Sequence, residues 1–223
     1  MAWSLKQTQT SSKTLSAGTT STASLSTTTA GSLVVVCTTT DSGTNSISSI
    51  TCAGMSFAKV DSSLVSGGTY DVELWYAFNI TAQTTPTLTI NYVAGAIGGG
   101  IIREYSGGLT TDPLDKHVIA VGTTASLSSG ATAALTGSND LVIGYGGTGD
   151  SGNTYTAGSG FANATTLKVG TTVDMGMEDK TLSGSTAAQT ATFTITNISN
   201  NACGVATFQI AAASAMPVAW LKA

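Results

Sequence analysis

Histidine is the side chain that most often moves protons at neutral pH, and this chain has one, His117. A serine hydrolase would place that histidine beside a serine and an aspartate, but the sequence has no Gly-x-Ser-x-Gly elbow. His117 follows the turn Pro113-Leu114-Asp115-Lys116, so we expect a surface or loop histidine. Metal sites built on several histidines are excluded, which leaves oxygen-ligand sites such as calcium.

Glycoside hydrolysis requires two facing carboxylates, and the glutamates of the chain are Glu73, Glu104 and Glu178. All three fall in expected strands, where a cross-strand structural role is favoured over catalysis. Glu104 directly follows Arg103, so in an extended strand these two side chains point to opposite faces and do not pair locally.

A second acidic group consists of Asp174, Glu178 and Asp179. The even spacing of Asp174 and Glu178 puts them on one strand face, with Asp179 on the other. Calcium at Asp174 and Glu178 is the alternative to a solvated or lysine-paired cluster with Lys180, and the latter is favoured. The sequence therefore assigns no catalytic, cofactor-binding or metal-binding residue, and no cofactor.

Aromatic side chains form the platforms on which sugars stack, and the tryptophans are Trp3, Trp75 and Trp220. Trp75 lies on the polar face of its expected strand, where a core position is favoured over an exposed platform. Tyr145 and Tyr155 are expected in loops, where they could stack on a glycan. A glycan is therefore the alternative ligand.

The glycine-rich run of residues 144–152 lacks the Lys-Ser/Thr ending of a phosphate-binding loop, and no helix is expected after it. Glycines inside expected strands instead predict bulges, bends or close backbone approach.

Cys37, Cys52 and Cys203 are an odd number of cysteines without a Cys-x-x-Cys pair. That pattern fits neither a disulfide framework nor a zinc site, so we expect reduced structural thiols. Cys37 and Cys203 are expected in the core. A bridge between Cys37 and Cys52 remains the alternative.

The composition indicates a folded chain with few charges. Of 223 residues, 41% are hydrophobic and 9% are charged, against about 25% charged in ordinary soluble domains. The mean hydropathy of +0.23 predicts a packed core. The net charge is −4 and Arg103 is the single arginine, so the basic surface that nucleic-acid binding requires is missing.

The polar N-terminal sequence Met1-Ala2-Trp3-Ser4-Leu5 predicts no secretory signal. Residues 202–221 are uncharged and about as long as a membrane span, but Gly204 and Pro217 interrupt them. Strand alternation describes this stretch better, so no membrane partner is expected.

Short β-type runs separated by Gly, Ser, Asn and Asp follow one another along the chain, and no apolar stripe of helical period appears. Alternation over residues 72–78, 87–92, 192–196 and 205–210 predicts half-buried antiparallel strands. Further strands are expected at 3–7, 33–37, 47–52, 57–63, 100–105, 117–123, 141–145, 173–182 and 218–222. The count favours an all-β, antiparallel β-sandwich of jelly-roll type. We expect residues 1–30 to be a Ser/Thr-rich arm or edge strands and residues 31–223 to form the sandwich, as a single domain overall.

Five segments carry a resemblance to a known type of module: Gly31-Ser32-Leu33-Val34-Val35-Val36, Glu73-Leu74-Trp75-Tyr76-Ala77, Arg103-Glu104-Tyr105-Ser106-Gly107 with the later Pro113-Leu114-Asp115, Asn139-Asp140-Leu141-Val142-Ile143-Gly144, and Met177-Glu178-Asp179-Lys180. In this order, over roughly residues 31–221, the chain resembles jelly-roll modules of tailed-phage virion proteins and bacterial surface proteins. These are strand signatures without an active site, and the expected lack of a leader favours the phage version.

The resemblance implies a non-enzymatic virion structural protein, made in the host cytoplasm without a signal peptide. The leading expectation is a capsid decoration or head-surface protein that forms homo-oligomers and docks on the major capsid or other virion proteins. A carbohydrate-binding adhesion module and a tail or fibre component are the alternatives.

Overall fold

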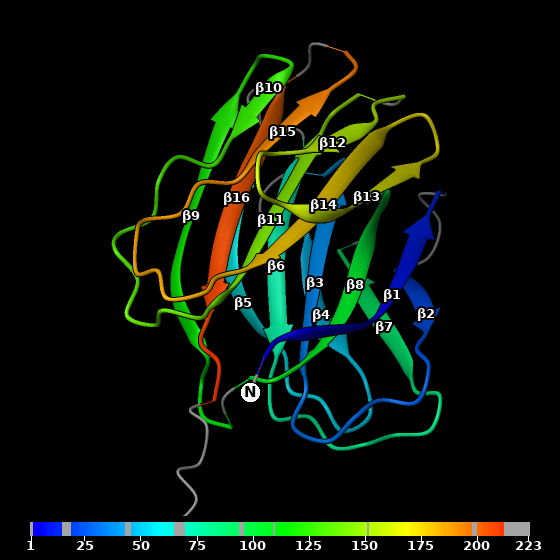
Figure 1. The fold of residues 1–223 in the computed structure, drawn as a ribbon. Coiled ribbons are helices and arrows are strands. Elements are labelled where there is room, and N and C mark those ends of the chain that lie inside the picture. The colour runs from blue at the N-terminus through cyan, green and yellow to red at the C-terminus, as the bar shows by residue number, and fades with distance from the viewer. Residues whose placement is uncertain are drawn as a thin grey trace, which may run out of the picture.

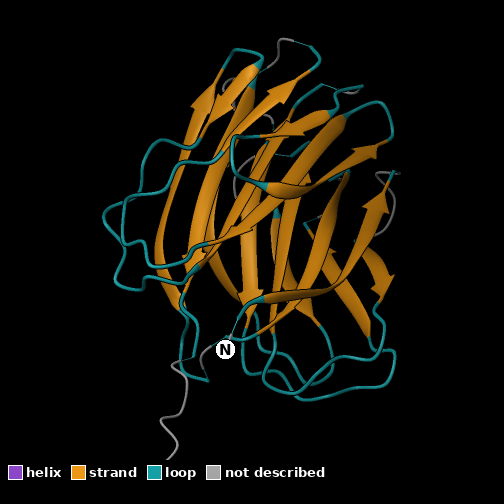
Figure 2. Ribbon diagram, in the orientation of Figure 1, coloured by secondary structure: helices purple, strands orange, loops and turns teal. Residues whose placement is uncertain are grey.

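The computed structural model describes residues 2–14, 19–42, 46–64, 70–93, 96–108, 110–150, 152–197 and 200–211. These residues form sixteen strands, all paired antiparallel, and the described ranges contain no helix (Figure 2). The expected all-β antiparallel sandwich is confirmed. The expected strand at 218–222, and Trp220 with it, lie outside the described residues.

The first eight strands form one unit, residues 4–106. A five-stranded sheet has the order β1-β8-β3-β6-β5, and a three-stranded sheet has the order β2-β7-β4. The strands are β1 (Ser4–Lys13), β2 (Thr20–Ser24), β3 (Leu33–Thr40), β4 (Ile47–Thr51), β5 (Ala58–Leu64), β6 (Asp71–Ala77), β7 (Thr87–Tyr92) and β8 (Gly98–Ser106).

The last eight strands form a second unit, residues 114–208, with the same topology. Its sheets have the orders β9-β16-β11-β14-β13 and β10-β15-β12, which are the orders of the first unit with eight added to every strand number. The strands are β9 (Leu114–Gly122), β10 (Ser126–Ser128), β11 (Leu141–Thr148), β12 (Tyr155–Ala157), β13 (Ala162–Val169), β14 (Val173–Thr181), β15 (Thr192–Ile195) and β16 (Asn201–Phe208).

Each unit therefore has the jelly-roll strand order, 1-8-3-6 in one sheet and 2-7-4 in the other. The fifth strand has moved to the edge of the larger sheet in both units. The expected boundary at residue 30 falls between β2 and β3, inside the first unit, because β1 and β2 already pair with β8 and β7.

The four sheets stack as layers in the order three, five, five and three strands, with a core between each pair of layers (Figure 1). Alternate residues of one strand enter different cores because successive strand side chains point to opposite faces. Leu33, Val35 and Cys37 of β3 enter the central core between the five-stranded sheets, whereas Val34 and Val36 enter the outer core of the first unit.

The two five-stranded sheets meet with approximate two-fold symmetry, and we call their contact the seam. β1 and β8 lie against β13, and their counterparts β9 and β16 lie against β5. The same contact is therefore made twice, once from the first unit to the second and once from the second to the first. The seam thus has the geometry of a two-fold dimer interface within one chain.

The sequences of the two units retain traces of this repeat. Phe57-Ala58 at the start of β5 corresponds to Phe161-Ala162 at β13. Residues 87–90, Thr-Leu-Thr-Ile, correspond to residues 192–195, Thr-Phe-Thr-Ile. The connections repeat as well, because the backbone N–H of Gln83 donates to Thr28 Oγ1 at 3.0 Å and that of Gln189 to Thr132 Oγ1 at 3.0 Å.

A polar cluster is also repeated at one end of each unit. It consists of Thr40, Ser46 and Asp71 in the first unit and of Thr148, Asn153 and Asp174 in the second. Both aspartates are fully buried at the start of the sixth strand of their unit. Asp71 Oδ2 accepts the N–H of Ser46 at 3.3 Å, and Asp174 Oδ2 accepts the N–H of Asn153 at 2.6 Å.

The sequence predicted that four alternating segments form strands with one buried and one exposed face, and this prediction was wrong for two of them. β7 and β15 do alternate between buried and more exposed residues, as expected. In β6 and β16 both faces are covered, so that Glu73 and Thr207 are buried on the face expected to meet solvent. The reason is that both strands belong to inner layers, which have a sheet on either side.

Candidate functional site

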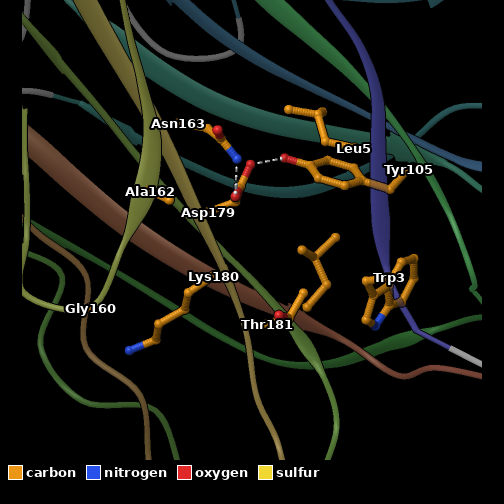
Figure 3. Close-up of a pocket in the computed structure, with 10 residues that line it drawn as sticks. Trp3, Leu5, Tyr105, Gly160, Ala162, Asn163, Asp179, Lys180 and Thr181 are labelled. Carbon is orange, nitrogen blue, oxygen red and sulfur yellow. Dashed lines mark hydrogen bonds between the residues drawn. The ribbon is translucent and has the colours of Figure 1, made fainter.

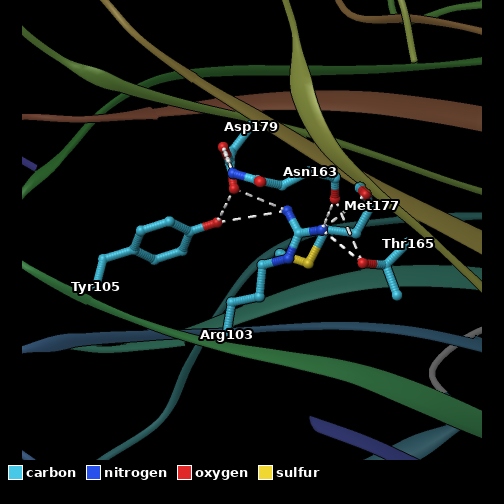
Figure 4. A network of polar contacts seen from close by, with 6 residues as sticks. All are labelled: Arg103, Tyr105, Asn163, Thr165, Met177 and Asp179. Carbon is cyan, nitrogen blue, oxygen red and sulfur yellow. Dashed lines mark hydrogen bonds and ion pairs between the residues drawn. The ribbon is translucent and has the colours of Figure 1, made fainter. Parts of the chain in front are cut away.

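Arg103 is buried at one end of the seam and joins the two units (Figure 4). It extends from β8 of the first unit to β13 and β14 of the second. Its Nη1 donates to Asp179 Oδ2 at 3.0 Å, and its Nη2 donates to Thr165 Oγ1 at 2.9 Å and to the carbonyl of Met177 at 3.0 Å. The carbonyl of Asn163 accepts a further bond from Nη2.

Tyr105 and Asn163 complete this seam network around Asp179. The phenol of Tyr105 donates to Asp179 Oδ2 at 2.6 Å, and Asn163 Nδ2 donates to Asp179 Oδ1 at 2.8 Å. Burial, with a contribution from the nearby carboxylate, raises the pKa of Tyr105 well above its usual value, so the phenol remains a donor. The network satisfies both oxygens of Asp179.

A pocket of about 360 Å³ opens beside this network, between β1 and β13, and we call it the seam pocket (Figure 3). Leu5, Tyr105 and Leu141 contribute ring and aliphatic surface, and the latter two are almost completely buried. The remaining lining residues are Trp3, Gly160, Ala162, Asn163, Asp179, Lys180 and Thr181.

Trp3 and Lys180 also line the pocket. Trp3 is 8% exposed, and its enclosed indole N–H has no hydrogen-bond partner among the residues that the structure describes. Lys180 lies with Nζ 4.3 Å from the ring centroid of Phe161, and burial lowers its pKa. The pocket thus combines an apolar floor with a polar rim, where Asn163 and Thr181 stand.

The opposite end of the seam is filled with aromatic rings. Tyr76 stacks on Phe78 with centroids 6.1 Å apart and contacts Phe208 at 5.5 Å. The Tyr76 hydroxyl donates to Asp112 at 2.9 Å. His117 lies near this end on the edge strand β9, with its side chain 42% exposed and its Nδ1 2.8 Å from Asp61 Oδ2 on β5.

The aromatic residues expected to meet sugars are mostly covered. Trp75 packs partly buried against the outer core of the first unit, donates its N–H to Glu73 Oε2 at 2.6 Å, and has Lys59 over its ring. The expectation for Tyr145 and Tyr155 was wrong, because both are buried in β11 and β12.

The glycines explain how these tyrosines fit inside the strands. A Cβ on Gly204, the neighbour of Tyr145 across β11 and β16, would lie 2.2 Å from the tyrosine ring. A Cβ on Gly176 would lie 2.4 Å from the ring of Tyr155. Close approach is thus the role of these strand glycines, as the sequence predicted.

The three glutamates do not form a facing pair. Glu73 and Glu104 share a face of one sheet but stand opposite Thr38 and Val34 of β3, and Glu178 lies in the other five-stranded sheet. Glu73 pairs with Lys59 at 2.9 Å, and Glu104 accepts from Gln7 at 2.6 Å. The opposite orientation of Arg103 and Glu104 is confirmed.

The solvated acidic cluster was also a wrong prediction. Asp174 and Glu178 do share a face, but they and Asp179 are buried, since β14 lies in an inner layer. Glu178 accepts the N–H of Gly158 at 2.8 Å, and burial raises its pKa to about 7. In the described part of the chain, no group of three or more His, Cys, Asp or Glu residues could hold a metal ion.

The three cysteines are free thiols, and two of them are buried. Cys37 is in the central core and Cys52 packs against the outer core of the first unit, so a sheet separates the two. The alternative of a Cys37–Cys52 bridge is therefore wrong. Burial raises the pKa of Cys37 to about 12 and that of Cys203 further, which makes both thiols unreactive.

Sequence reasoning missed the seam pocket because its residues come from distant strands. Trp3 stands far from the others in the sequence, and Thr181 carries no motif. The signal that could have found them is the Phe-Ala repeat at residues 57–58 and 161–162, which aligns the two units and exposes the differences between them.

Comparisons with family models, with curated proteins and with solved structures found no match. The described residues include no helix with the length and apolar character of a membrane span.

Proposed function

We propose that this chain is a non-enzymatic structural protein of a tailed-phage virion. It decorates the head surface, where copies associate with one another and dock on the major capsid protein or another shell subunit. The proposal places the protein in the virion after synthesis in the host cytoplasm.

The observation that carries the proposal is the chemistry of the two outer faces, one on each three-stranded sheet. The first outer face consists of Thr20, Thr22, Ser24, Thr51, Thr87, Thr89 and Asn91, and the second of Ser126, Ser128, Thr156, Thr192 and Thr194. Neither face carries a charged residue, although designed soluble surfaces are about 25–35% charged.

Charges are instead directed inward. Nine described charged residues are buried: Lys13, Asp71, Glu73, Arg103, Glu104, Asp140, Asp174, Glu178 and Asp179. Copies that meet through hydroxyl-covered sheets and free strand edges would experience little electrostatic repulsion, which supports dense packing on a shell. The covered carboxylates, and an exposed His117 whose neighbour is the single carboxylate of Asp61, support a role in contact rather than in catalysis.

The test is binding to empty shells that lack this chain. The purified protein should pellet with such shells and sediment as an oligomer in velocity ultracentrifugation. Thr89→Lys and Thr194→Lys, at equivalent positions of the two outer faces, should weaken shell binding at least tenfold through charge repulsion and desolvation. Thr186→Lys, in an exposed loop, is the matched control. A strictly monomeric protein that never pellets with shells would refute the proposal.

A tail or fibre position would use the same surfaces, and localisation in the virion distinguishes it from the head. The glycan alternative loses support because Trp75 is hydrogen-bonded and partly buried with Lys59 over its ring, and Tyr145 and Tyr155 are buried. A glycan array with Trp75→Ala tests it: glycan binding lost in this variant while the fold is kept would favour adhesion.

A further inference from the structure

The two ends of the seam can be compared residue by residue, because strand register relates the units. In the second unit, Leu141 of β11 pairs with Thr181. The counterpart of Leu141 in the first unit is Leu33, which comes one residue before Val34, the partner of Ala77. By this register, Thr181 of the seam pocket corresponds to Phe78 at the opposite end, and Asp179 corresponds to Tyr76. Each end therefore serves as a control for the other.

The same fold position is filled at one end and open at the other. Phe78 packs against the central core and stacks on Tyr76, which in turn contacts Phe208. At the pocket end, the small side chain of Thr181 replaces the phenylalanine ring, and Asp179 replaces the tyrosine. The open space is a property of these substitutions and not a requirement of the fold.

We propose that the seam pocket receives one aromatic side chain of the virion protein on which this chain docks. This inference rests on the proposed function and identifies its anchor point. The group that fits is indicated by the molecule itself, since Phe78 occupies the equivalent space. Leu5, Leu141 and Tyr105 provide the apolar floor, and buried aromatic anchors in such pockets dominate the energy of many interfaces.

The polar groups of the pocket fit the backbone that carries such a ring. The indole N–H of Trp3 is enclosed by the protein, so the polar groups that a docked segment can reach are those at the rim. Asn163 and Thr181 at the rim add exposed amide and hydroxyl groups. The pocket lies between β1 and β13, which are edge strands of their sheets, so an extended segment can reach it.

The first experiment uses N-acetyl-L-phenylalaninamide as the probe, because it combines the ring with two peptide groups. Protein-observed NMR should show saturable shifts at the Trp3 indole N–H, with N-acetyl-L-alaninamide at least tenfold weaker. Thr181→Phe, which copies the closed end, should abolish the shifts, and Ala162→Phe is a second way to fill the pocket. Thr192→Phe makes the same change on an outer face and should keep them.

Each variant is first checked for folding by its urea midpoint. No saturable shift in the wild-type protein, or shifts that persist in both folded pocket-filling variants, would overturn the inference. Loss of the shifts in a folded Thr181→Phe or Ala162→Phe, with retention in Thr192→Phe, supports it.

The second experiment separates this inference from the proposed function. If the pocket is the anchor, Thr181→Phe should lower shell binding at least tenfold. Shell binding that survives the closed pocket would overturn the inference and leave the proposed function standing, whereas a wild-type chain that binds no shell refutes the proposed function. Binding of an oligosaccharide that Thr181→Phe abolishes would also overturn the inference, because the pocket would then serve a glycan.

Discussion

Arg103 is the one guanidinium of the chain, and it lies between the units rather than at the surface. Its planar fork donates to a side-chain carboxylate, a hydroxyl and backbone carbonyls at once, which an ammonium group cannot reproduce. Removal of one partner of a buried ion pair leaves the other charge uncompensated.

We therefore expect Arg103→Met to lower the free energy of unfolding by about 3–5 kcal/mol, measured by urea denaturation. Adding Asp179→Asn should recover part of the loss, because the uncompensated carboxylate is gone. Lys168→Ala, at an exposed position of β13, is the control and should change stability by less than about 0.5 kcal/mol. A loss below about 1 kcal/mol for Arg103→Met would contradict the structural role of the seam network.

Three buried carboxyl groups give the protein an unusual pH dependence. Burial raises the pKa of Glu178 to about 7, burial and Asp71 raise that of Glu73 to about 7, and burial and Asp115 raise that of Asp140 to about 7. A folded-state pKa above the unfolded value means that the contribution to stability is complete below about pH 4 and disappears as pH rises through 7.

Stability should therefore decrease by on the order of 2–5 kcal/mol between pH 5 and pH 8 and change little above that range. Urea midpoints at pH 5, 6, 7 and 8 measure this slope. Glu178→Gln, which remains neutral throughout, should make the slope shallower. A stability that rises from pH 5 to pH 8 would show that these groups are ionised in the folded protein.

At the scale of single residues, the sequence predicted orientation better than environment. The alternation of a strand placed Arg103 and Glu104 on opposite faces and Asp174 and Glu178 on one face, because the two-residue period is a local property. Burial of these charges was not predictable, since it depends on layers contributed by segments far away in the chain.

At the scale of elements, the repeated aspartate at the start of the sixth strand provides an internal comparison. Asp71 and Asp174 each accept a backbone N–H from the segment that enters the fourth strand of their unit. Their equivalent roles predict equivalent costs of removal.

Asp71→Ala and Asp174→Ala should each lower the free energy of unfolding by about 1–3 kcal/mol, because a buried N–H loses its acceptor. The two losses, measured by urea denaturation, should agree within about 1 kcal/mol. Asp150→Ala, exposed next to the second cluster, is the control. If one substitution is neutral and the other severe, the two clusters are not structural counterparts.

The sequence predicted that the chain forms many short strands in a sandwich of jelly-roll type, because strand periodicity and turn residues are local signals. For β6 and β16, the sequence did not predict that both faces of the strand are buried. Glu73, Trp75 and Thr207 give these strands a polar face that resembles a solvent face, and only the neighbouring sheet shows that it is an interior one.

At the scale of the whole molecule, the central core couples the two units. It contains residues of both five-stranded sheets, such as Leu74 of the first unit and Met175 of the second. The duplication leaves only a weak signal in the sequence, because the two units share only short stretches such as Phe-Ala and Thr-x-Thr. The two units differ most at the seam, where Arg103 and Tyr76 correspond to Ala206 and Asp179.

The shared core predicts one cooperative unfolding transition for the described units. Val36→Ala lies in the outer core of the first unit and Val142→Ala in that of the second. Each should shift the midpoint of one shared urea transition and lower the free energy of unfolding by about 1–3 kcal/mol. Fluorescence and far-ultraviolet circular dichroism should give coincident curves. Two separate transitions, each sensitive to one substitution, would mean that the units fold independently.

The central claim is that this molecule is a building block of a virion surface, acting through contact. Electron cryo-microscopy of purified virions whose genome encodes the chain tests that claim most directly. We predict density for the paired jelly rolls on the outside of the head shell, with the seam pocket or an outer sheet face against a shell subunit. Virions that contain no copy of the chain would contradict the claim.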